Sequence, residues 1–425
     1  MVNFGQSLRA VSFICHLRLE GGMASGLLLL GVIILVGFVG NVLFSKTRIP
    51  ESVFLMVIGI LVGPVFNVVA PAFFLDKAGF LLSLALVLVL LESGLSLDLA
   101  KTIRNASGAL FLTVLVLLLT TALVTLVTVL GFHWPLLNGI FLGIVGSGTT
   151  TITVTHLLAQ LKVGEDTKTL LVLESILNDV TLIAAATILI SLARAGPAPL
   201  IHRLVFNELV MSPALGLLAG GVWAFLFLRY LPSHRLTYVF TLGMALVIYD
   251  GSQFLGYNGA LVVLAFSLFL GNYPSVLGKL NNAALVGRLL TPLQRDVWMV
   301  RTVNNELTFL MRTLFFVFLG VVFSPSSLRG EILLVVGMLT LTQLAARYLA
   351  ARALVRLFPL YQGGVPVITV MVARGFTSTL IALFALQAGL VIDNLVEIVL
   401  LLVLSTTLFA TLGTALVHGR MERVS

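Results

Sequence analysis

Apolar runs of about 20 residues recur along almost the whole of this sequence, from Ser25 to Val417. A helix of that length spans about 30 Å, which matches the hydrocarbon thickness of a bilayer. Because 59% of the residues are hydrophobic and only 10% are charged, no stretch between the runs is polar enough to form a separate soluble domain. The sequence therefore predicts one all-α polytopic membrane domain over residues 25–425. A tail at residues 1–24 precedes it, with Met1 and Met23 as alternative starts.

A hydropathy window of about 19 residues predicts about thirteen membrane-spanning helices. Between them, only the stretch from Asn272 to Asn304 is longer than a loop. The predicted spans are residues 25–44, 52–68, 79–97, 106–130, 134–160, 167–193, 208–231, 236–255, 258–271, 305–323, 331–357, 365–388 and 395–418.

The basic residues are distributed unevenly between the two sides that thirteen spans define. About 17 Lys and Arg fall on the side of the C-terminus and about 6 on the opposite side. Because cytoplasmic loops carry the excess of Lys and Arg, we expect a multi-pass protein of the cell (inner) membrane with a cytoplasmic C-terminus. The expected cytoplasmic set is Lys46, Arg48, Lys101, Arg104, Lys162, Lys168, Arg229, Arg235, Lys279, Arg288, Arg295, Arg301, Arg347, Arg352, Arg356, Arg420 and Arg423.

The net charge of +8 does not indicate nucleic-acid binding, because the basic residues lie in short loops and not along one face. The single Cys15 excludes a disulfide within one chain, and no Cys/His cluster has the spacing of a metal site. An intramembrane aspartyl protease is disfavoured because Asp250 has no Gly-x-Gly-Asp partner. The isolated His156 is interpreted as a packing or solvent-lining residue. We therefore expect neither an enzyme nor a bound cofactor.

Charged groups at bilayer depth cost about 2.5–3.5 kcal/mol on insertion scales, so they are expected where function requires them. The span at residues 167–193 contains the string LVLESILNDVTLI, in which Glu174, Ser175, Asn178 and Asp179 interrupt an apolar sequence. A spacing of four places Glu174 over Asn178 and Ser175 over Asp179 on the helix surface. The pattern favours a functional polar face, and a polar patch that only packs helices together is the alternative.

Two other spans have weak helix propensity at their centres. GIVGSGTTTITVTH contains Gly146, Gly148 and a run of threonines, and VMVARGFTSTL contains Arg374 and Gly375. Unwound backbone at this depth is tolerated only where it lines a cavity or is buried in protein. Two such interruptions in corresponding positions of two halves are typical of inverted-repeat transporters. For either span alone, the alternative is an ordinary helix with small packing residues.

Several strings resemble, in the same order, the NhaP-type sodium/proton antiporters and the related eukaryotic sodium/hydrogen exchangers. RIPESVFLMVIGILVGP and LLESGLSLDL are similar to the family's second and third spans, and LVLESILNDVTLI is similar to its sixth-span motif. IYDGSQFLGYNGALVVLAFSLFLGN and NNELTFLMRTLFFVFLG are similar to later spans. The resemblance implies a core domain at about residues 106–193 and 331–418, in which two interrupted helices cross. This core would rock against a dimerisation (scaffold) domain at about residues 25–97 and 208–323.

The resemblance also assigns roles to individual residues. It implies that the ion lies at Asp179, Ser175, Thr149, Glu92 and Thr150, that Glu174, Asn178 and Arg374 form a buried bracing network, and that Arg312 is an interdomain charge whose partner is open. Because a guanidinium inside the membrane needs a carboxylate, we expect Glu174 to pair with Arg374. In the family, an Asn before the ion-binding Asp accompanies electroneutral exchange.

One departure from the family pattern lies in the fifth span. Where most members have Thr-Asp-Pro, this chain has Thr149, Thr150 and Thr151. The missing carboxylate removes a negative charge that would offset a positive helix end, so the choice of ion stays open.

We expect a homodimer in membrane lipid that exchanges a monovalent cation for protons. Sodium is favoured, with potassium or lithium as alternatives. Asp179 would bind cation and proton in turn. A cation channel, a sensor or a transporter of altered selectivity is the alternative function, because Thr150 replaces the acidic residue.

Overall fold

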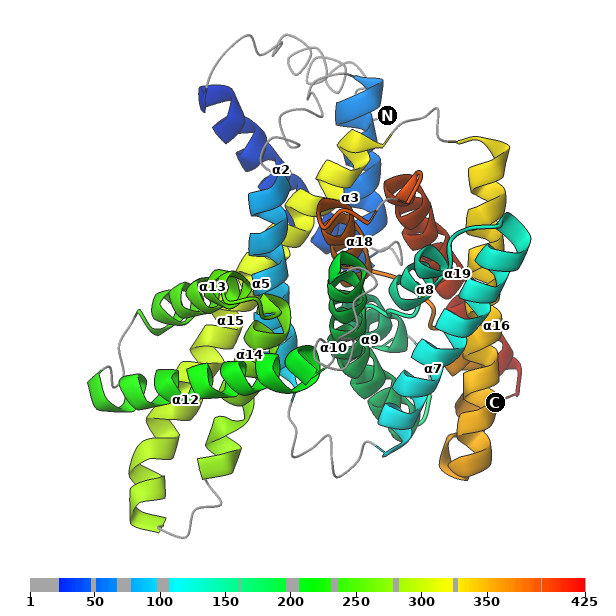
Figure 1. Cartoon of the computed structure of the whole chain (residues 1–425). Helices are drawn as coiled ribbons and strands as arrows, with labels where there is room; N and C mark the ends of the chain where they lie inside the picture. The colour runs from blue at the N-terminus through cyan, green and yellow to red at the C-terminus, as the bar shows by residue number, and fades with distance from the viewer. Residues whose placement is uncertain are drawn as a thin grey trace, which may run out of the picture.

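The computed structural model describes residues 23–46, 51–66, 78–97, 107–159, 161, 163–195, 206–230, 236–277, 283–323, 328–390 and 392–424. This part of the chain forms fifteen α-helices with short π and 3-10 turns (Figure 1). The α-helices are α2 (Met23–Lys46), α3 (Glu51–Ile60), α5 (Ala78–Ser96), α7 (Ser107–Leu126), α8 (Leu136–Val145), α9 (Thr151–Ala159), α10 (Glu165–Ala195), α12 (Ser212–Tyr230), α13 (Thr237–Phe254), α14 (Gly259–Leu277), α15 (Ala283–Val322), α16 (Gly330–Leu357), α17 (Val365–Val370), α18 (Phe376–Gln387) and α19 (Leu395–Val424). The turns are η1 (Leu61–Val65), η2 (Val127–Gly131), η3 (Asn207–Met211) and η5 (Pro359–Gly364).

Helices occupy all thirteen predicted segments. Within the described residues, seven helices are long and apolar enough to cross a membrane by themselves, and others are shorter apolar helices. The stretch from Asn272 to Asn304, which the sequence marks as longer than a loop, is largely helical in the described residues, because α14 continues to Leu277 and α15 begins at Ala283. The predicted tail at residues 1–24 lies outside the described residues up to residue 22.

The helices form two groups (Figure 1). Helices α7 to α10 pack with α16 to α19, whereas α2, α3 and α5 pack with α12 to α15. The two groups meet where α5 contacts α10 and α18, and where α14 contacts α10. The first is called the core group below and the second the scaffold group; the expected division into two domains, and any movement of one against the other, stays a prediction.

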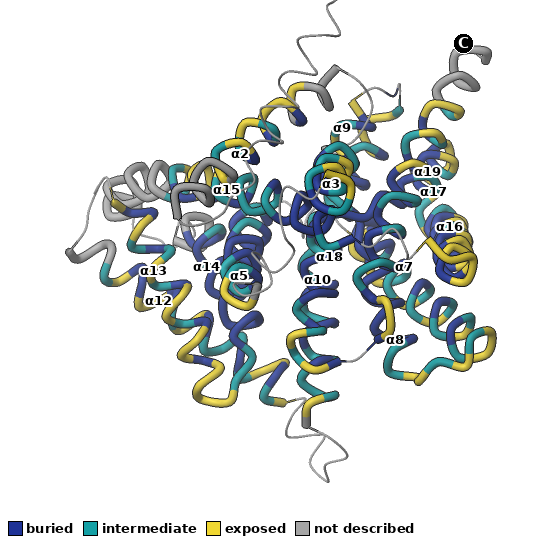
Figure 2. Tube along the Cα trace, turned by 90° about the horizontal axis from the view of Figure 1, so that it is seen from above, coloured by how far each residue is buried: buried dark blue, intermediate teal, exposed yellow. Residues whose placement is uncertain are grey.

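Exposed residues lie toward the periphery and buried residues concentrate toward the centre (Figure 2), and many of the exposed residues are large and apolar. Leu35, Leu118, Leu218 and Val247, from four different helices, are 60–69% exposed. Such a surface is unfavourable in water and suits contact with lipid tails. The exposed face therefore agrees with a chain embedded in a bilayer.

Candidate functional site

Two interrupted helices cross inside the first helix group. Residues 146–150 separate α8 from α9, and residues 371–375 separate α17 from α18. The backbone N–H of Thr150 donates a hydrogen bond to the carbonyl of Ala373 at 3.1 Å, which joins the two unwound segments. Gly375 permits this close approach, since a Cβ at that position would lie 2.5 Å from the Cβ of Thr150. The predicted pair of interrupted helices is confirmed.

A cavity of about 160 Å³ lies beside this crossing, between the two helix groups. Its walls come from α5, α10 and α15 and from the first turns of α9 and α18. Two carboxylates, Glu92 and Asp179, and two guanidinium groups, Arg301 and Arg312, line it together with serine and threonine hydroxyls. The crossing thus forms the floor of a polar cavity inside an apolar helix assembly.

Asp179 lies on α10 and is partly exposed to the cavity. Its carboxylate interacts with the hydroxyls of Thr151, the first residue of α9, and Thr377, the second residue of α18. Helix N-termini carry partial positive charge and unpaired N–H groups. The negative charge of Asp179 is therefore placed where two half-helices begin.

Glu92 shares the cavity with Asp179 but has a counter-charge. Its Oε2 lies 3.5 Å from Nη2 of Arg312, and the guanidinium of Arg312 also lies over the ring of Phe376, 6.0 Å from its centroid. Arg312 therefore connects α15 with α5 in its own helix group and with α18 in the other. The sequence left the partner of Arg312 open. In the structure this partner is the carboxylate of Glu92, at the boundary between the two helix groups.

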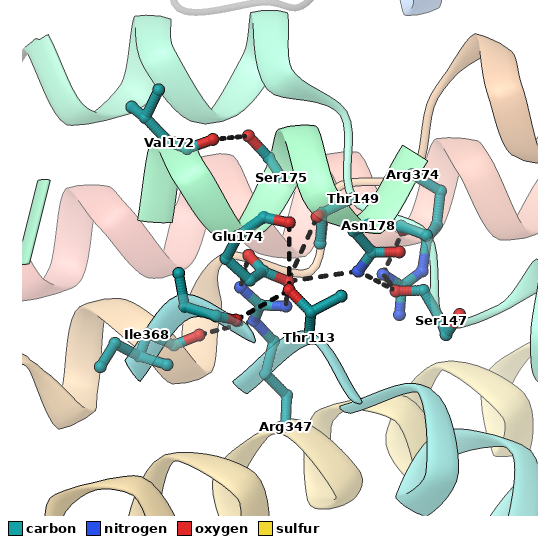
Figure 3. Close-up of polar contacts among 12 residues, drawn as sticks. Thr113, Ser147, Thr149, Val172, Glu174, Ser175, Asn178, Arg347, Ile368 and Arg374 are labelled. Carbon is teal, nitrogen blue, oxygen red and sulfur yellow. Dashed lines mark hydrogen bonds and ion pairs between the residues drawn. The ribbon is translucent and has the colours of Figure 1, made fainter. Parts of the chain in front are cut away.

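A second ionic cluster is fully buried (Figure 3), and its members are not among the described residues that line the cavity. Arg347 on α16 binds Glu174 in a bidentate manner, with Nη1 to Oε1 at 3.1 Å and Nη2 to Oε2 at 2.9 Å. The same Oε1 accepts hydrogen bonds from Thr149 at 3.4 Å and from Asn178 at 3.2 Å. This cluster holds α10 against α16 and against the unwound segment before α9.

The expected ion pair between Glu174 and Arg374 is wrong, because Arg374 has other partners. Its Nη1 donates to the carbonyl of Ser147 at 3.1 Å and to that of Gly148, and its Nε donates to Oε1 of Gln343 at 3.3 Å. These carbonyls follow the C-terminus of α8, where a helix carries partial negative charge. Backbone carbonyls and an amide therefore take the place of a carboxylate around Arg374.

The structure separates the residues that were expected together at the ion. Asp179, Glu92 and Thr150 line the cavity, whereas Thr149 and Ser175 are not among its described lining residues. Thr149 is directed to Glu174, and Ser175 donates to the carbonyl of Val172 in its own helix at 2.9 Å (Figure 3). In this conformation, these two hydroxyls face the packed interior of the helix group.

Sequence reasoning missed several residues of the site. Arg347 was assigned to a cytoplasmic loop, which is wrong because its side chain is fully buried in the middle of α16. Its position well inside the predicted span 331–357 was the signal, but it was counted on the cytoplasmic side together with Arg352 and Arg356, which lie nearer the end of that span. Thr377 and Arg301 had no such signal.

Of the expected cytoplasmic residues, Arg48, Lys101, Arg104, Lys162, Arg235 and Lys279 lie outside the described residues.

The whole fold is similar to that of a solved transporter. It superposes on the sodium proton antiporter MjNhaP1 from Methanocaldococcus jannaschii at pH 8 with a TM-score of 0.71 and 17% identity, covering 91% of this chain and 98% of that one. An electron-microscopy structure of MjNhaP1 matches with a TM-score of 0.61, 19% identity and coverage of 93% and 96%. The likeness confirms the predicted all-α multi-pass membrane fold.

The sequence matches the family described as "Sodium/hydrogen exchanger, transmembrane" over residues 30–418. The chain therefore belongs to the sodium/hydrogen exchanger family, which comprises monovalent cation/proton antiporters and not enzymes.

Two curated relatives are distant. Sodium/hydrogen exchanger 7 of Arabidopsis thaliana is 25% identical over 275 residues, or 59% of this chain and 23% of that protein. The K(+)/H(+) antiporter NhaP2 of Shewanella sp. (strain ANA-3) is 27% identical over 283 residues, or 60% of this chain and 48% of that protein. The matches thus span less than half of each relative.

Proposed function

We propose that the protein exchanges a small monovalent cation for protons at Asp179 by alternating access. The observation that carries this proposal is the environment of Asp179. Within the described part of the chain, it is the carboxylate that lines the cavity without an ion pair, since Glu92 is paired with Arg312. A dehydrated negative charge favours binding of a counter-ion, and either a proton or a small cation can supply it.

Competition at one carboxylate couples the two fluxes. Asp179 binds either a proton or the cation, and an empty, charged site is costly to move through a low-dielectric barrier. The cavity beside Asp179 lies at the boundary between the helix groups, which contact each other through α5, α10, α14 and α18. This arrangement supports stoichiometric exchange over a continuous conducting pore.

The choice of cation depends on the hydroxyls around the site. Thr150, Thr151 and Thr377 supply neutral oxygens, and no carboxylate stands at position 150. We propose sodium as the first cation to test and potassium as the second. Potassium is included because of the Thr150 departure and because a relative is named a K(+)/H(+) antiporter. The neutral Asn178 beside Asp179 supports electroneutral exchange.

The wider setting of this activity belongs to the same proposal. We propose a homodimer formed through the scaffold group, in the cell (inner) membrane, with the C-terminus in the cytoplasm. The support is the charge distribution of the loops and the family resemblance.

The test uses everted membrane vesicles in which respiration creates a proton gradient that a fluorescent dye reports. Wild-type protein should collapse the gradient when sodium, potassium or lithium is added, and Asp179→Asn should not. Glu306→Gln is the matched control, because Glu306 is an exposed acid on α15 outside the cavity lining. No cation-dependent response in the wild type, or an equal response in Asp179→Asn, would reject the proposal.

A further inference from the structure

Glu208 is a buried acid in an apolar helical segment, and the site at Asp179 does not use it. Its side chain is only 8% exposed, whereas its neighbours Phe206 and Leu209 are 51% and 56% exposed. It lies in the π-helical turn η3, just before α12. Ionisable residues in membrane spans and π-helical turns both concentrate at functional positions.

The carboxylate of Glu208 bridges the two helix groups. It interacts with the hydroxyl of Ser191, on α10 of the core group, and with the side chain of Asn258 in the scaffold group. Asn258 is oriented by its own role at the start of α14, where its Oδ1 accepts from the N–H of Ala260 at 3.1 Å and of Leu261 at 3.3 Å. The amide of Asn258 is thereby left to face Glu208.

One oxygen of this carboxylate has no hydrogen-bond partner. Oε2 of Glu208 is buried and unpartnered among the described residues. Packing alone does not explain an acid at position 208. A glutamine or a serine could form hydrogen bonds with Ser191 and Asn258 without leaving a charged oxygen unpaired.

Glu208 and the cavity lie on opposite sides of Asp179. Ser191 follows Asp179 on α10 by 12 residues, which corresponds to about 18 Å along the helix. The cavity involves the C-terminal half of α5, at Glu92 and Ser96. The first turn of α5 lies instead toward the end of α10: a Cβ at Gly79 would lie 3.2 Å from Nε2 of Gln387, and Arg194 on α10 donates to the carbonyl of the neighbouring Ala388 at 3.0 Å.

We propose that Glu208 lines the second access path to Asp179. In this conformation, its interaction with Ser191 closes the boundary between the helix groups on the side opposite the cavity. In the alternate conformation, this boundary opens and Glu208 becomes the negative charge that attracts an incoming cation toward Asp179. This inference rests on the proposed antiport, because it assigns a residue to the second of two access paths.

The first test compares apparent cation affinity on the two faces of oriented proteoliposomes. Glu208→Gln should raise the half-saturating cation concentration on the face nearer Glu208 roughly threefold to tenfold, because a focusing negative charge is lost, and leave the other face unchanged. Asp250→Asn is the matched control, since it removes an exposed acid near the same end of the molecule and should change neither value. An equal change on both faces, or no change, would overturn the assignment.

The second test reports opening of the boundary without relying on flux. In a Cys15→Ser background, Ser191→Cys should react with a membrane-impermeant thiol reagent from the Glu208 face only. Absence of labelling from that face would contradict a path there, even if Glu208→Gln does not fold. A wild-type protein without cation-dependent proton flux would instead reject the antiport proposal, so the two failures are distinguishable.

Discussion

Asp179 differs from the other acids near the crossing in what surrounds it. Glu174 is neutralised by Arg347, and Glu92 is neutralised by Arg312. Asp179 has hydroxyl groups and two helix N-termini, none of which carries a full charge. Arg312 acts on Asp179 from across the cavity but is paired with Glu92, so a counter-charge in direct contact with the Asp179 carboxylate is left for a bound ion to supply, which is the property that an exchanger requires.

The Glu174–Arg347 pair predicts a strong effect on stability. Glu174→Ala or Arg347→Ala should each lower the free energy of unfolding by about 3–5 kcal/mol, because each leaves a buried charge unpaired. The double variant should lose much less than the sum, because it leaves neither charge behind. Thermal unfolding of the purified protein in detergent measures this.

The exposed pair between Lys168 and Glu165, at 2.8 Å, is the control. Removing Glu165 should change stability by about 0–1 kcal/mol, because water screens an exposed pair. Additive effects of the two core variants would contradict the bracing role of Glu174 and Arg347.

Thr150 tests the departure from the family pattern. Thr150→Asp adds a carboxylate to the cavity close to the N-terminus of α9 and near Asp179. Two acids in one site disfavour simultaneous ionisation, so we expect the pH profile of exchange to shift upward and the preference between sodium and potassium to change. Thr150→Ser keeps a hydroxyl and should retain the wild-type profile. Unaltered profile and selectivity in Thr150→Asp would place residue 150 outside the electrostatic reach of the ion.

At the scale of elements, the crossing of the interrupted helices depends on backbone contact. Gly375→Ala should destabilise the protein by about 1–3 kcal/mol and impair exchange, because the added methyl overlaps Thr150. Thr150→Gly in the same chain should restore part of the stability, since it removes the overlapping atoms. Gly221→Ala, on a helix with open space around the position, is the control and should not destabilise. Equal stabilities of the two alanine variants would show that the segments do not meet at Gly375.

The helices and their interruptions could be predicted from the sequence, whereas the partners of the buried charged side chains could not. Apolar length located the helices, and Gly146, Gly148 and the threonines located an interruption, because hydropathy and helix propensity are local properties. The pairing of Glu174 with Arg347 joins residues 173 positions apart, and no local pattern encodes that distance. The polar face of the sixth predicted span could be recognised from the sequence. That Glu174 lies in a buried ionic cluster while Asp179 lines the cavity depends on tertiary packing, which the sequence pattern does not specify.

At the scale of the whole molecule, the two helix groups meet along α5, α10, α14 and α18. The cavity lies within this boundary on one side of Asp179, and Glu208 closes it on the other. A rocking movement of one group against the other would close the cavity on one side of Asp179 and open the boundary on the other side, so that no separate gate is needed.

The loop charges predict the orientation of the molecule. A cysteine introduced at Ser425 in a Cys15→Ser background should react with an impermeant thiol reagent only from the cytoplasm, because the Lys and Arg excess lies on the side of the C-terminus. Right-side-out and everted vesicles give the two arms of the measurement. Labelling from the outside would contradict the count of thirteen spans.

If one carboxylate binds cation and proton in turn, binding of the cation must release a proton, and this release can be measured on the purified protein. The protein is held in weakly buffered detergent with a pH indicator, and the cation with the highest flux is added. The wild type should release about one proton for each cation bound, since binding of the two ligands is reciprocally linked, and Asp179→Asn should release none. Cation binding by the wild type without proton release, or undiminished release from Asp179→Asn, would contradict it.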